Sequence, residues 1–324
     1  MGLLVNGAWQ EDISRTKEGR FIRPAAAFRN FVTPDGSAGP SGEGGFAAEA
    51  GRYHLYISLA CPWAHRTLIF RALKKLDDGI SISITEPLYG KTGWEFGTGR
   101  GGMRDDANGK MTLAEIYLLA DPHYTGRVSV PVLWDKKRRT IVNNESSEII
   151  RMLNSAFDAL TDVRADYYPL ALRGEIDAIN DVVYPNINNG VYRAGFATTQ
   201  NAYDEAARAI FATFDDIEKR LSRQRYLVGS QITEADWRLF TTLVRFDAVY
   251  YSHFKCNLRR VADYPNLWNY TRDLYQVPGI AETVSIDHIK RHYYGSQRQV
   301  NPTGIVPIGP AIDFAAPHDR ARFG

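Results

Sequence analysis

Residues 53–76 read YHLYISLACPWAHRTLIFRALKKL, and this stretch decides the fold of the first half of the chain. Its first part, residues 54–58, is predicted to be a strand. A short turn that contains Cys61 and Pro62 follows. Apolar side chains then recur at helical spacing, at Leu68, Ile69, Ala72, Leu73 and Leu76. The stretch therefore predicts a strand, a tight turn and a helix, with a cysteine in the turn.

The segments that follow extend this unit into a small α/β domain. Residues 80–84 alternate apolar side chains with serine and are predicted to be a second strand. Residues 128–134 and 140–142 are predicted to be a third and a fourth strand, joined by a charged turn. Ser146 or a neighbouring residue is expected to cap a helix with an apolar face made by Ile149, Ile150 and Leu153.

The second half of the chain is predicted to be all-helical. After Asn154 no strand pattern returns, and helical patterns cover residues 166–189, 201–223, 233–251 and 264–276. The chain has 324 residues, which suggests about two domains. We therefore expect the fold class α/β plus all-α, with a first domain over residues 51–157, a linker near residues 156–164 and a helical domain over residues 165–324.

The first 50 residues carry only weak patterns. Pro34-Asp35-Gly36-Ser37 and the glycine-rich residues 39–45 are typical of turns and loops. We interpret residues 1–50 as an N-terminal extension that wraps the surface or borders a site. A disordered tail is the alternative.

Composition and charge exclude several classes of protein. Lys plus Arg number 39 and Asp plus Glu 37, so the net charge is +2 and no basic field indicates a nucleic-acid partner. No stretch approaches the ~20 apolar residues of a membrane span, and the first residues do not resemble a signal peptide. Two cysteines cannot form a disulfide scaffold, which favours a reducing compartment. We expect a cytoplasmic protein that binds neither nucleic acid nor membrane.

Cys61 points most directly to chemistry. It lies between a predicted strand and a predicted helix, with Pro62 in the first helical turn. Unpaired N–H groups and the helix dipole stabilise a thiolate at a helix N-terminus, so the pKa of such a thiol is depressed and a nucleophile is expected there. His65 and Arg66 follow on the same helix and could assist. The alternative is a small buried cysteine in a turn.

The neighbours of Cys61 indicate a site with a single thiol. Ala64 stands where a dithiol motif would carry its second cysteine, and Cys256 is far away in sequence and is interpreted as structural. A single catalytic thiol needs an external thiol to complete a redox cycle. Glutathione is the obvious candidate in the cytoplasm.

Two further segments suggest a binding site for a γ-glutamyl peptide. The proline of Val130-Pro131 is a candidate cis residue, which would leave the backbone of Val130 able to pair with an extended peptide. Ser146 and a helix N-terminus can bind a carboxylate, while the Glu145 carboxylate can bind an ammonium group. The alternatives are an ordinary edge-strand proline and a plain helix cap.

These motifs, in this order, resemble those of the glutathione transferase superfamily. They comprise Cys61-Pro62-Trp63-Ala64, Val130-Pro131, Glu145-Ser146 and the capping box Thr233-Glu234-Ala235-Asp236. The chain is most similar to the Xi class, the glutathionyl-hydroquinone reductases. The motifs of that class are His65-Arg66 after the cysteine, Asn189-Gly190-Val191-Tyr192 with Gly195-Phe196-Ala197, and His292-Tyr293-Tyr294-Gly295. The resemblance covers nearly the whole chain. It implies a thioredoxin-like N-terminal domain, an all-helical glutathione-transferase C-terminal domain and a homodimer.

The resemblance also implies roles for individual residues. Cys61 would be the nucleophile. The co-substrate glutathione would be held by Trp94, Arg127, Val130, Glu145 and Ser146. The aromatic substrate would be surrounded by Tyr192, Tyr250 and Tyr293. No metal is implied.

The implied reaction removes glutathione from a glutathionyl-hydroquinone. The Cys61 thiolate would attack the sulfur on the ring, and the ring carbon would leave and be protonated. A second glutathione would then release glutathione disulfide from the enzyme. Two alternatives stay open. One is an omega-like thiol transferase or dehydroascorbate reductase, and the other is a non-catalytic binding module of the same fold.

Three other signals are interpreted as structural. Residues 97–102, GTGRGG, match a dinucleotide fingerprint but lack the flanking strand and helix, so we expect a mobile loop near the site. His288 and His292 are spaced for a metal but have no third ligand nearby, so a solvated helix face is expected. The basic residues 136–139 are expected to form a solvated hairpin turn.

Overall fold

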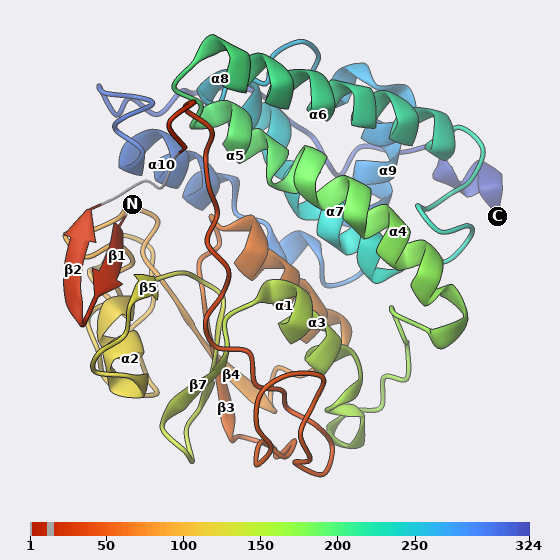
Figure 1. Ribbon diagram of the computed structural model, residues 1–324. Helices are drawn as coiled ribbons and strands as arrows, with labels where there is room; N and C mark the ends of the chain where they lie inside the picture. Colours follow the sequence, from red (N-terminus) through yellow and green to blue (C-terminus); the bar gives the residue numbers. More distant parts are fainter. Residues whose placement is uncertain (1, 12–15) are drawn as a thin grey trace. The chain divides into compact units, whose positions relative to one another are not determined.

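The computed structural model describes residues 2–11 and 16–324, which divide into two units (Figure 1). Of these residues, the first unit holds residues 2–11 and Arg23–Asp166, and the second holds residues 16–22 and Tyr167–Gly324. The N-terminal extension therefore contributes to both units. In the described part of the chain, no helix is long and apolar enough to cross a membrane.

The first unit is built on a four-stranded sheet in the order β4-β3-β6-β7. The strands are β3 (Tyr53–Ile57), β4 (Ile80–Ile84), β6 (Val132–Asp135) and β7 (Thr140–Asn143). β3 runs parallel to β4 and antiparallel to β6, and β6 runs antiparallel to β7. All five residues of β3 are buried, as expected for a strand inside a covered sheet.

Three helices accompany this sheet: α1 (Pro62–Leu73), α2 (Leu113–Ala120) and α3 (Ser146–Ser155). α1 and α3 pack against each other, and α2 packs against β7. The predicted strand–turn–helix around Cys61 is therefore confirmed. Helix α2 was missed by the sequence analysis, although Thr112 and Glu115 form a capping box at its start.

The strand predicted over residues 128–134 is partly wrong. Only Val132–Asp135 joins the main sheet as β6, and Pro131, directly before it, has no N–H to donate to the ladder. The preceding Gly126–Arg127 forms β5 in a second sheet of order β2-β1-β5. This sheet contains β1 (Gly2–Val5) and β2 (Ala8–Glu11) from the extension.

The described part of the extension is folded, which favours a surface-wrapping segment over a disordered tail. Asn6 and Gly7 both have positive φ, 47° and 78°, and make the tight hairpin turn between β1 and β2. Further along, Phe31, Val32 and Phe46 are buried. The Asn-Gly pair is a turn signal that sequence reasoning could have used.

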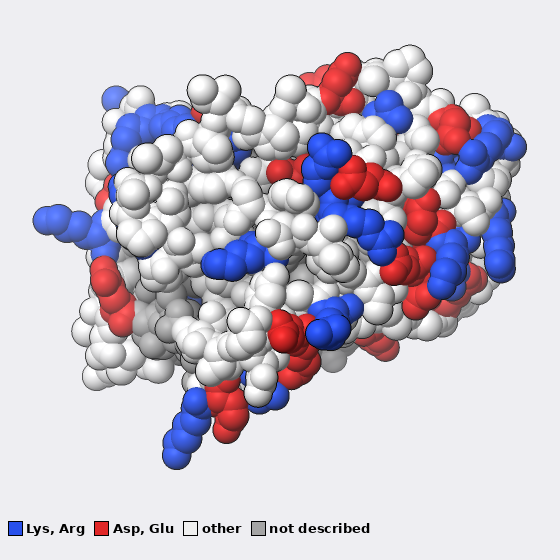
Figure 2. Space-filling view, turned by 90° about the horizontal axis from the view of Figure 1, so that it is seen from above, with Lys and Arg blue, Asp and Glu red and all other residues white. Residues whose placement is uncertain are grey.

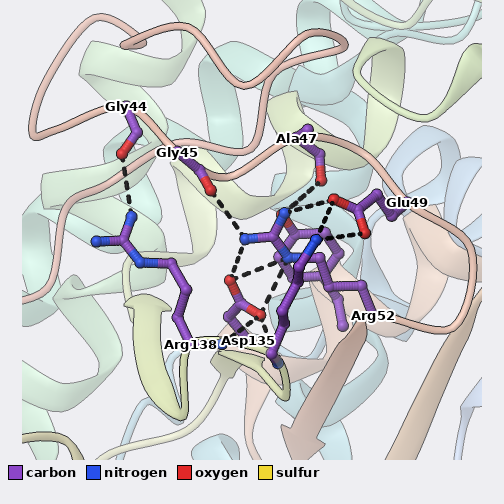
Figure 3. Close-up of polar contacts among 9 residues, drawn as sticks. Gly44, Gly45, Ala47, Glu49, Arg52, Asp135 and Arg138 are labelled. Atoms are coloured by element: carbon purple, nitrogen blue, oxygen red, sulfur yellow. Dashed lines mark hydrogen bonds and ion pairs between the residues drawn. The ribbon is translucent and has the colours of Figure 1, made fainter.

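Figure 3 shows how the glycine-rich part of the extension is anchored. The buried guanidinium of Arg52 donates to Asp135 (Nε to Oδ1, 3.1 Å), to Glu49 (2.8 Å) and to the carbonyl of Gly45 (2.8 Å). Arg138 donates to the carbonyl of Gly44 at 3.1 Å. Asp135 is completely buried, so a paired cation is needed to compensate its charge.

The second unit is helical, as predicted, and every strand that the structure describes lies in the first unit. Its α-helices are α4 (Arg173–Val183), α5 (Gly190–Gly195), α6 (Gln200–Leu221), α7 (Glu234–Arg245), α8 (Tyr251–His253), α9 (Pro265–Tyr275) and α10 (Ile286–Ser296). Two predicted long helices are interrupted by π-helical segments, Tyr184–Asn188 and Phe246–Tyr250. Such segments are frequent at functional sites.

The start of α7 confirms the predicted capping box. Asp236 accepts a hydrogen bond from the backbone N–H of Thr233 at 2.7 Å. The same carboxylate accepts from the backbone of Leu227 and the hydroxyl of Tyr270, both at 2.8 Å. A buried carboxylate with these partners fixes the start of the helix to two other segments of the unit.

The charged surface agrees with the balanced composition. On the face shown in Figure 2, Lys and Arg side chains are interspersed with Asp and Glu side chains.

The basic turn at residues 136–139 is held by local hydrogen bonds, since the carboxylate of Asp135 accepts from the backbone N–H groups of Lys137 and Arg138. Arg138 also lies over the ring of Phe46, so the turn serves to anchor the extension.

Candidate functional site

Cys61 is the N-cap residue of α1, with an extended backbone (φ −82°, ψ 123°). Its side chain is 9% exposed, and its Sγ donates to the carbonyl of Val130 at 3.6 Å. Its carbonyl accepts the first helical hydrogen bond, from the N–H of His65. The thiol therefore lies where the dipole of α1 favours a negative charge.

Val130 connects the thiol to the second predicted binding element. The Val130-Pro131 bond is cis, as the sequence analysis suggested. Val130 is 3% exposed and stands between β5 and β6, outside both strands. Its contact with Cys61 brings together two motifs that are separated by 69 residues in the sequence.

Glu145 is the N-cap of α3, and Ser146 is the first residue of the helix. The carboxylate of Glu145 accepts from the backbone N–H and the hydroxyl of Ser147, at 3.0 and 2.9 Å. The cap is therefore the neighbouring residue Glu145 and not Ser146. The hydroxyl of Ser146 instead accepts from the buried guanidinium of Arg66 on α1, at 3.4 Å. The starts of α1 and α3 are thus joined.

Trp94 and Arg127 lie in the same unit and are held by neighbours of their own. Trp94 is 4% exposed, and its ring makes an edge contact with Tyr89 at 4.6 Å. Arg127 is half-buried in β5, where it is paired with Leu3. It precedes Val130 by only three residues, so its backbone belongs to the same connection between the two sheets.

The loop 97–102 encloses a carboxylate of the protein itself. Glu86 is completely buried and accepts hydrogen bonds from the backbone N–H groups of Thr98 (2.6 Å), Arg100 (3.3 Å) and Gly102 (3.0 Å). Burial is the largest influence on the pKa of Glu86 and raises it, but these hydrogen bonds together hold the pKa below its usual value. The glycine-rich loop therefore binds an internal anion in place of a dinucleotide phosphate.

The three tyrosines form a cluster in the second unit. The hydroxyl of Tyr293 lies 2.5 Å from that of Tyr192 and 2.9 Å from that of Tyr250. They come from α10, α5 and the π-helical segment Phe246–Tyr250, and Tyr192 and Tyr293 are 101 residues apart. Burial raises the pKa of Tyr293 well above its usual value, so this phenol stays protonated. Tyr192, at 8% exposed, is more accessible than Tyr250 or Tyr293.

Two other predictions about side chains are now decided by burial. His288 and His292 are 7% and 5% exposed, so the predicted solvated helix face is wrong. Both residues lie on α10, whose inner face is packed into the helical unit. Cys256 is completely buried, and burial raises the pKa of its thiol far above the usual value.

Comparisons with known proteins match both units. The family model of the glutathione S-transferase N-terminal domain matches residues 60–156, and that of the C-terminal domain matches residues 200–273. The chain is 56% identical to "Glutathionyl-hydroquinone reductase YqjG" of Escherichia coli over 100% of both chains. It is 52% identical to "Glutathionyl-hydroquinone reductase PcpF" of Sphingobium chlorophenolicum, covering 96% of this chain and 97% of the relative. A third relative, 44% identical over 91% of this chain and 95% of its own, is "Glutathione S-transferase omega-like 2" of Schizosaccharomyces pombe.

Solved structures agree with these relatives. The glutathione-bound structure of YqjG from Escherichia coli has a TM-score of 0.92 at 54% identity and covers 99% of each chain. A Xi-class glutathione transferase from Natrialba magadii has a TM-score of 0.91 at 48% identity, covering 100% of this chain and 97% of that one. The expected fold, a thioredoxin-like domain with a helical glutathione-transferase domain, is confirmed.

Proposed function

Since the chain belongs to the glutathionyl-hydroquinone reductases, the Xi class of the glutathione transferase superfamily, we propose that it uses glutathione to reduce glutathionyl-hydroquinones to hydroquinones. The observation that carries this function is the position of Cys61. It caps α1, and its sulfur contacts the carbonyl of Val130 next to a cis proline. A thiol in this place is suited to form a mixed disulfide with a bound glutathionyl group.

In the first step, the Cys61 thiolate attacks the sulfur that joins glutathione to the ring. A sulfur–sulfur bond forms and the carbon–sulfur bond breaks, and the ring carbon keeps the electron pair and takes up a proton. The products are the hydroquinone and a Cys61–glutathione mixed disulfide. The thiolate of a second glutathione then attacks the mixed disulfide. This step releases glutathione disulfide, regenerates Cys61 and balances the two-electron reduction.

We assign the glutathionyl group to the first unit. The backbone of Val130 is suited to pair with the peptide part of glutathione, and the carboxylate of Glu145 is suited to bind its ammonium group. Ser146 and the N–H groups of the first turn of α3 are suited to its γ-glutamyl carboxylate. Trp94 and Arg127 complete the set that the family resemblance implies.

We assign the aromatic ring to the tyrosine cluster of the second unit. Tyr192, Tyr250 and Tyr293 bring three phenolic hydroxyl groups together, and each such hydroxyl can donate and accept hydrogen bonds. A protonated phenol of this kind can donate to a hydroquinone oxygen or supply a proton to the ring carbon.

Mass spectrometry of a single turnover tests the mechanism. Given glutathionyl-hydroquinone and no free glutathione, the protein should release hydroquinone once and gain one glutathionyl group on Cys61. Cys61→Ala should lose this reaction, while Cys256→Ala, the matched control for the buried thiol, should keep it. Release of hydroquinone by Cys61→Ala at the rate of the unmodified protein would refute the covalent mechanism.

A thiol transferase is the second candidate, because one relative is named omega-like. Hydroxyethyl disulfide and dehydroascorbate should be compared with glutathionyl-hydroquinone as substrates of the same preparation. A higher kcat/KM on either of the first two would reverse our order of preference. We also propose that the protein is cytoplasmic, since the cycle consumes reduced glutathione and neither Cys61 nor Cys256 is in a disulfide. We propose a homodimer because the family resemblance implies one. Light scattering after size-exclusion chromatography tests the dimer.

A further inference from the structure

The hydroxyl of Tyr117 on α2 joins two segments of the first unit that lie next to the glutathione-binding residues. It donates to the carbonyl of Ser129 at 2.8 Å and accepts from the N–H of Ser129 at 3.3 Å. It also accepts from the side-chain amide of Asn144 at 3.0 Å. Tyr117 is completely buried, and burial raises the pKa of its phenol, so the group remains a neutral donor.

Each partner of this hydroxyl directly precedes a residue assigned to glutathione. Ser129 is followed by Val130-Pro131, and Asn144 is followed by Glu145-Ser146. Val130 lies between β5 and β6, and Glu145 and Ser146 lie at the start of α3, just after β7. One phenol therefore joins the backbone that would bind the peptide to the cap that would bind the γ-glutamyl end.

The N-terminal extension completes the arrangement around Asn144. The side-chain oxygen of Asn144 accepts from the N–H of Phe28 at 3.1 Å, and the N–H of Asn144 donates to the carbonyl of Phe28 at 3.1 Å. The N–H of Asn30 donates to the carbonyl of Val142 at 3.0 Å, so this part of the extension pairs with the end of β7. The ring of Phe28 makes an edge contact with that of Tyr117.

We propose that Tyr117 and Asn144 are positioning residues for glutathione, and that residues 28–30 of the extension are a structural part of the glutathione site. This inference rests on the proposed function, because it takes Val130 and Glu145 as glutathione ligands. A tripeptide held at both ends binds tightly only if its two sets of ligands are already at the right separation. The phenol supplies this separation without touching glutathione.

The test compares two buried tyrosine hydroxyls of the same unit. Tyr117→Phe removes the hydroxyl that joins the two segments and keeps the ring. Tyr53→Phe is the matched control, because Tyr53 is also completely buried and its hydroxyl donates to the extension, at the carbonyl of Ala47 (2.7 Å). Glutathione binding is measured by calorimetry, and stability is measured by urea denaturation.

We expect Tyr117→Phe to raise the Kd and the KM for glutathione about tenfold, with kcat at saturation changed less than about twofold. Tyr53→Phe should lower the urea denaturation midpoint about as much as Tyr117→Phe does, and it should leave the Kd for glutathione unchanged. Phe28→Ala, which removes the ring packed on Tyr117 and Tyr124 and keeps the backbone bonds to Asn144, should also raise the Kd.

Equal Kd values for Tyr117→Phe and the unmodified protein would overturn the inference. So would an equal rise of the Kd in Tyr117→Phe and Tyr53→Phe, because the effect would then follow stability alone. If Tyr117→Phe does not fold, Phe28→Ala decides by the same criterion. Failure of the unmodified protein to bind glutathione would refute the proposed function itself, and with it this inference.

Discussion

The carboxylate of Glu145 accepts hydrogen bonds from both the N–H and the hydroxyl of Ser147, and both bonds end on Oε1. The residue proposed to bind the ammonium group of glutathione is therefore also the N-cap of α3. Oε2 is the oxygen that would meet the ligand. Substitution of Glu145 should consequently affect both the stability of the protein and its affinity for glutathione.

Glu145→Ala should lower the free energy of unfolding by about 0.5–2 kcal/mol through loss of the cap. It should also weaken glutathione binding by about 1–3 kcal/mol through loss of a charged hydrogen bond. Glu145→Gln separates the two effects, since an amide oxygen can still accept from Ser147 but carries no charge. Calorimetry should show that Gln retains most of the stability and little of the affinity. Full affinity in Glu145→Gln would leave Glu145 as a cap alone.

The two cysteines should differ strongly in reactivity. Cys61 lies at the N-terminus of α1, which favours its thiolate, and the completely buried Cys256 has a pKa raised by burial. Iodoacetamide should therefore label Cys61 already at a pH below ~8.5, the pKa of a free thiol. It should leave Cys256 unmodified in the folded protein. Peptide mass spectrometry against pH gives both rates in one experiment. Labelling of Cys61 that begins only above this pH would contradict the helix-terminus argument.

The buried His54 should make the first unit less stable in acid. Its ring nitrogens lie 2.8 and 3.0 Å from the hydroxyls of Ser81 and Ser83, and burial lowers its pKa to about 4. The unfolded chain, with a histidine pKa near 6.5, binds more protons between these values, so stability falls as the pH falls. The loss should be about 2 kcal/mol between pH 7 and pH 5.

Urea denaturation at several pH values measures this loss. His54→Gln should flatten part of the pH dependence even if it lowers the stability at neutral pH. The exposed His123 provides a control, since His123→Gln should leave the slope unchanged. An unaltered slope in His54→Gln would show that another group causes the acid sensitivity.

The buried pair of Arg52 and Asp135 should be important for stability. Asp135→Asn leaves the guanidinium of Arg52 buried without its main counter-charge and should cost about 3–5 kcal/mol of unfolding free energy. Because Arg52 also binds the carbonyl of Gly45, limited proteolysis should cut the glycine-rich part of the extension faster. The control is the ion pair between Arg291 and the exposed Asp287 on α10. Asp287→Asn should lower the free energy of unfolding by less than about 1 kcal/mol. Similar losses in both variants would contradict the assignment.

Much of the fold could be predicted because its signals are local. The strand, the Cys61 turn and α1 lie within one stretch of sequence, and the four long helical patterns needed only the spacing of apolar residues. The errors arose where a local signal was misleading. A run of apolar residues over 128–134 suggested one strand, but only Val132 to Trp134 of that run lie in β6, and residues 128–131 form the connection from β5. His288 and His292 looked like solvated residues, because spacing alone does not show which face of α10 is buried.

By itself, the sequence determined the position of Cys61 at a helix N-terminus and the order of the motifs around it, because capping and periodicity act over a few neighbouring residues. The tertiary structure alone decided that Tyr293 meets Tyr192 and Tyr250, that Tyr117 joins Ser129 to Asn144, and that the Glu86 carboxylate fills a loop with a dinucleotide-like sequence. Hydrogen-bond partners such as Tyr192 and Tyr293 are 101 residues apart. They meet only because packing of the helices removes their side chains from water, where each polar group must then find a partner within the protein.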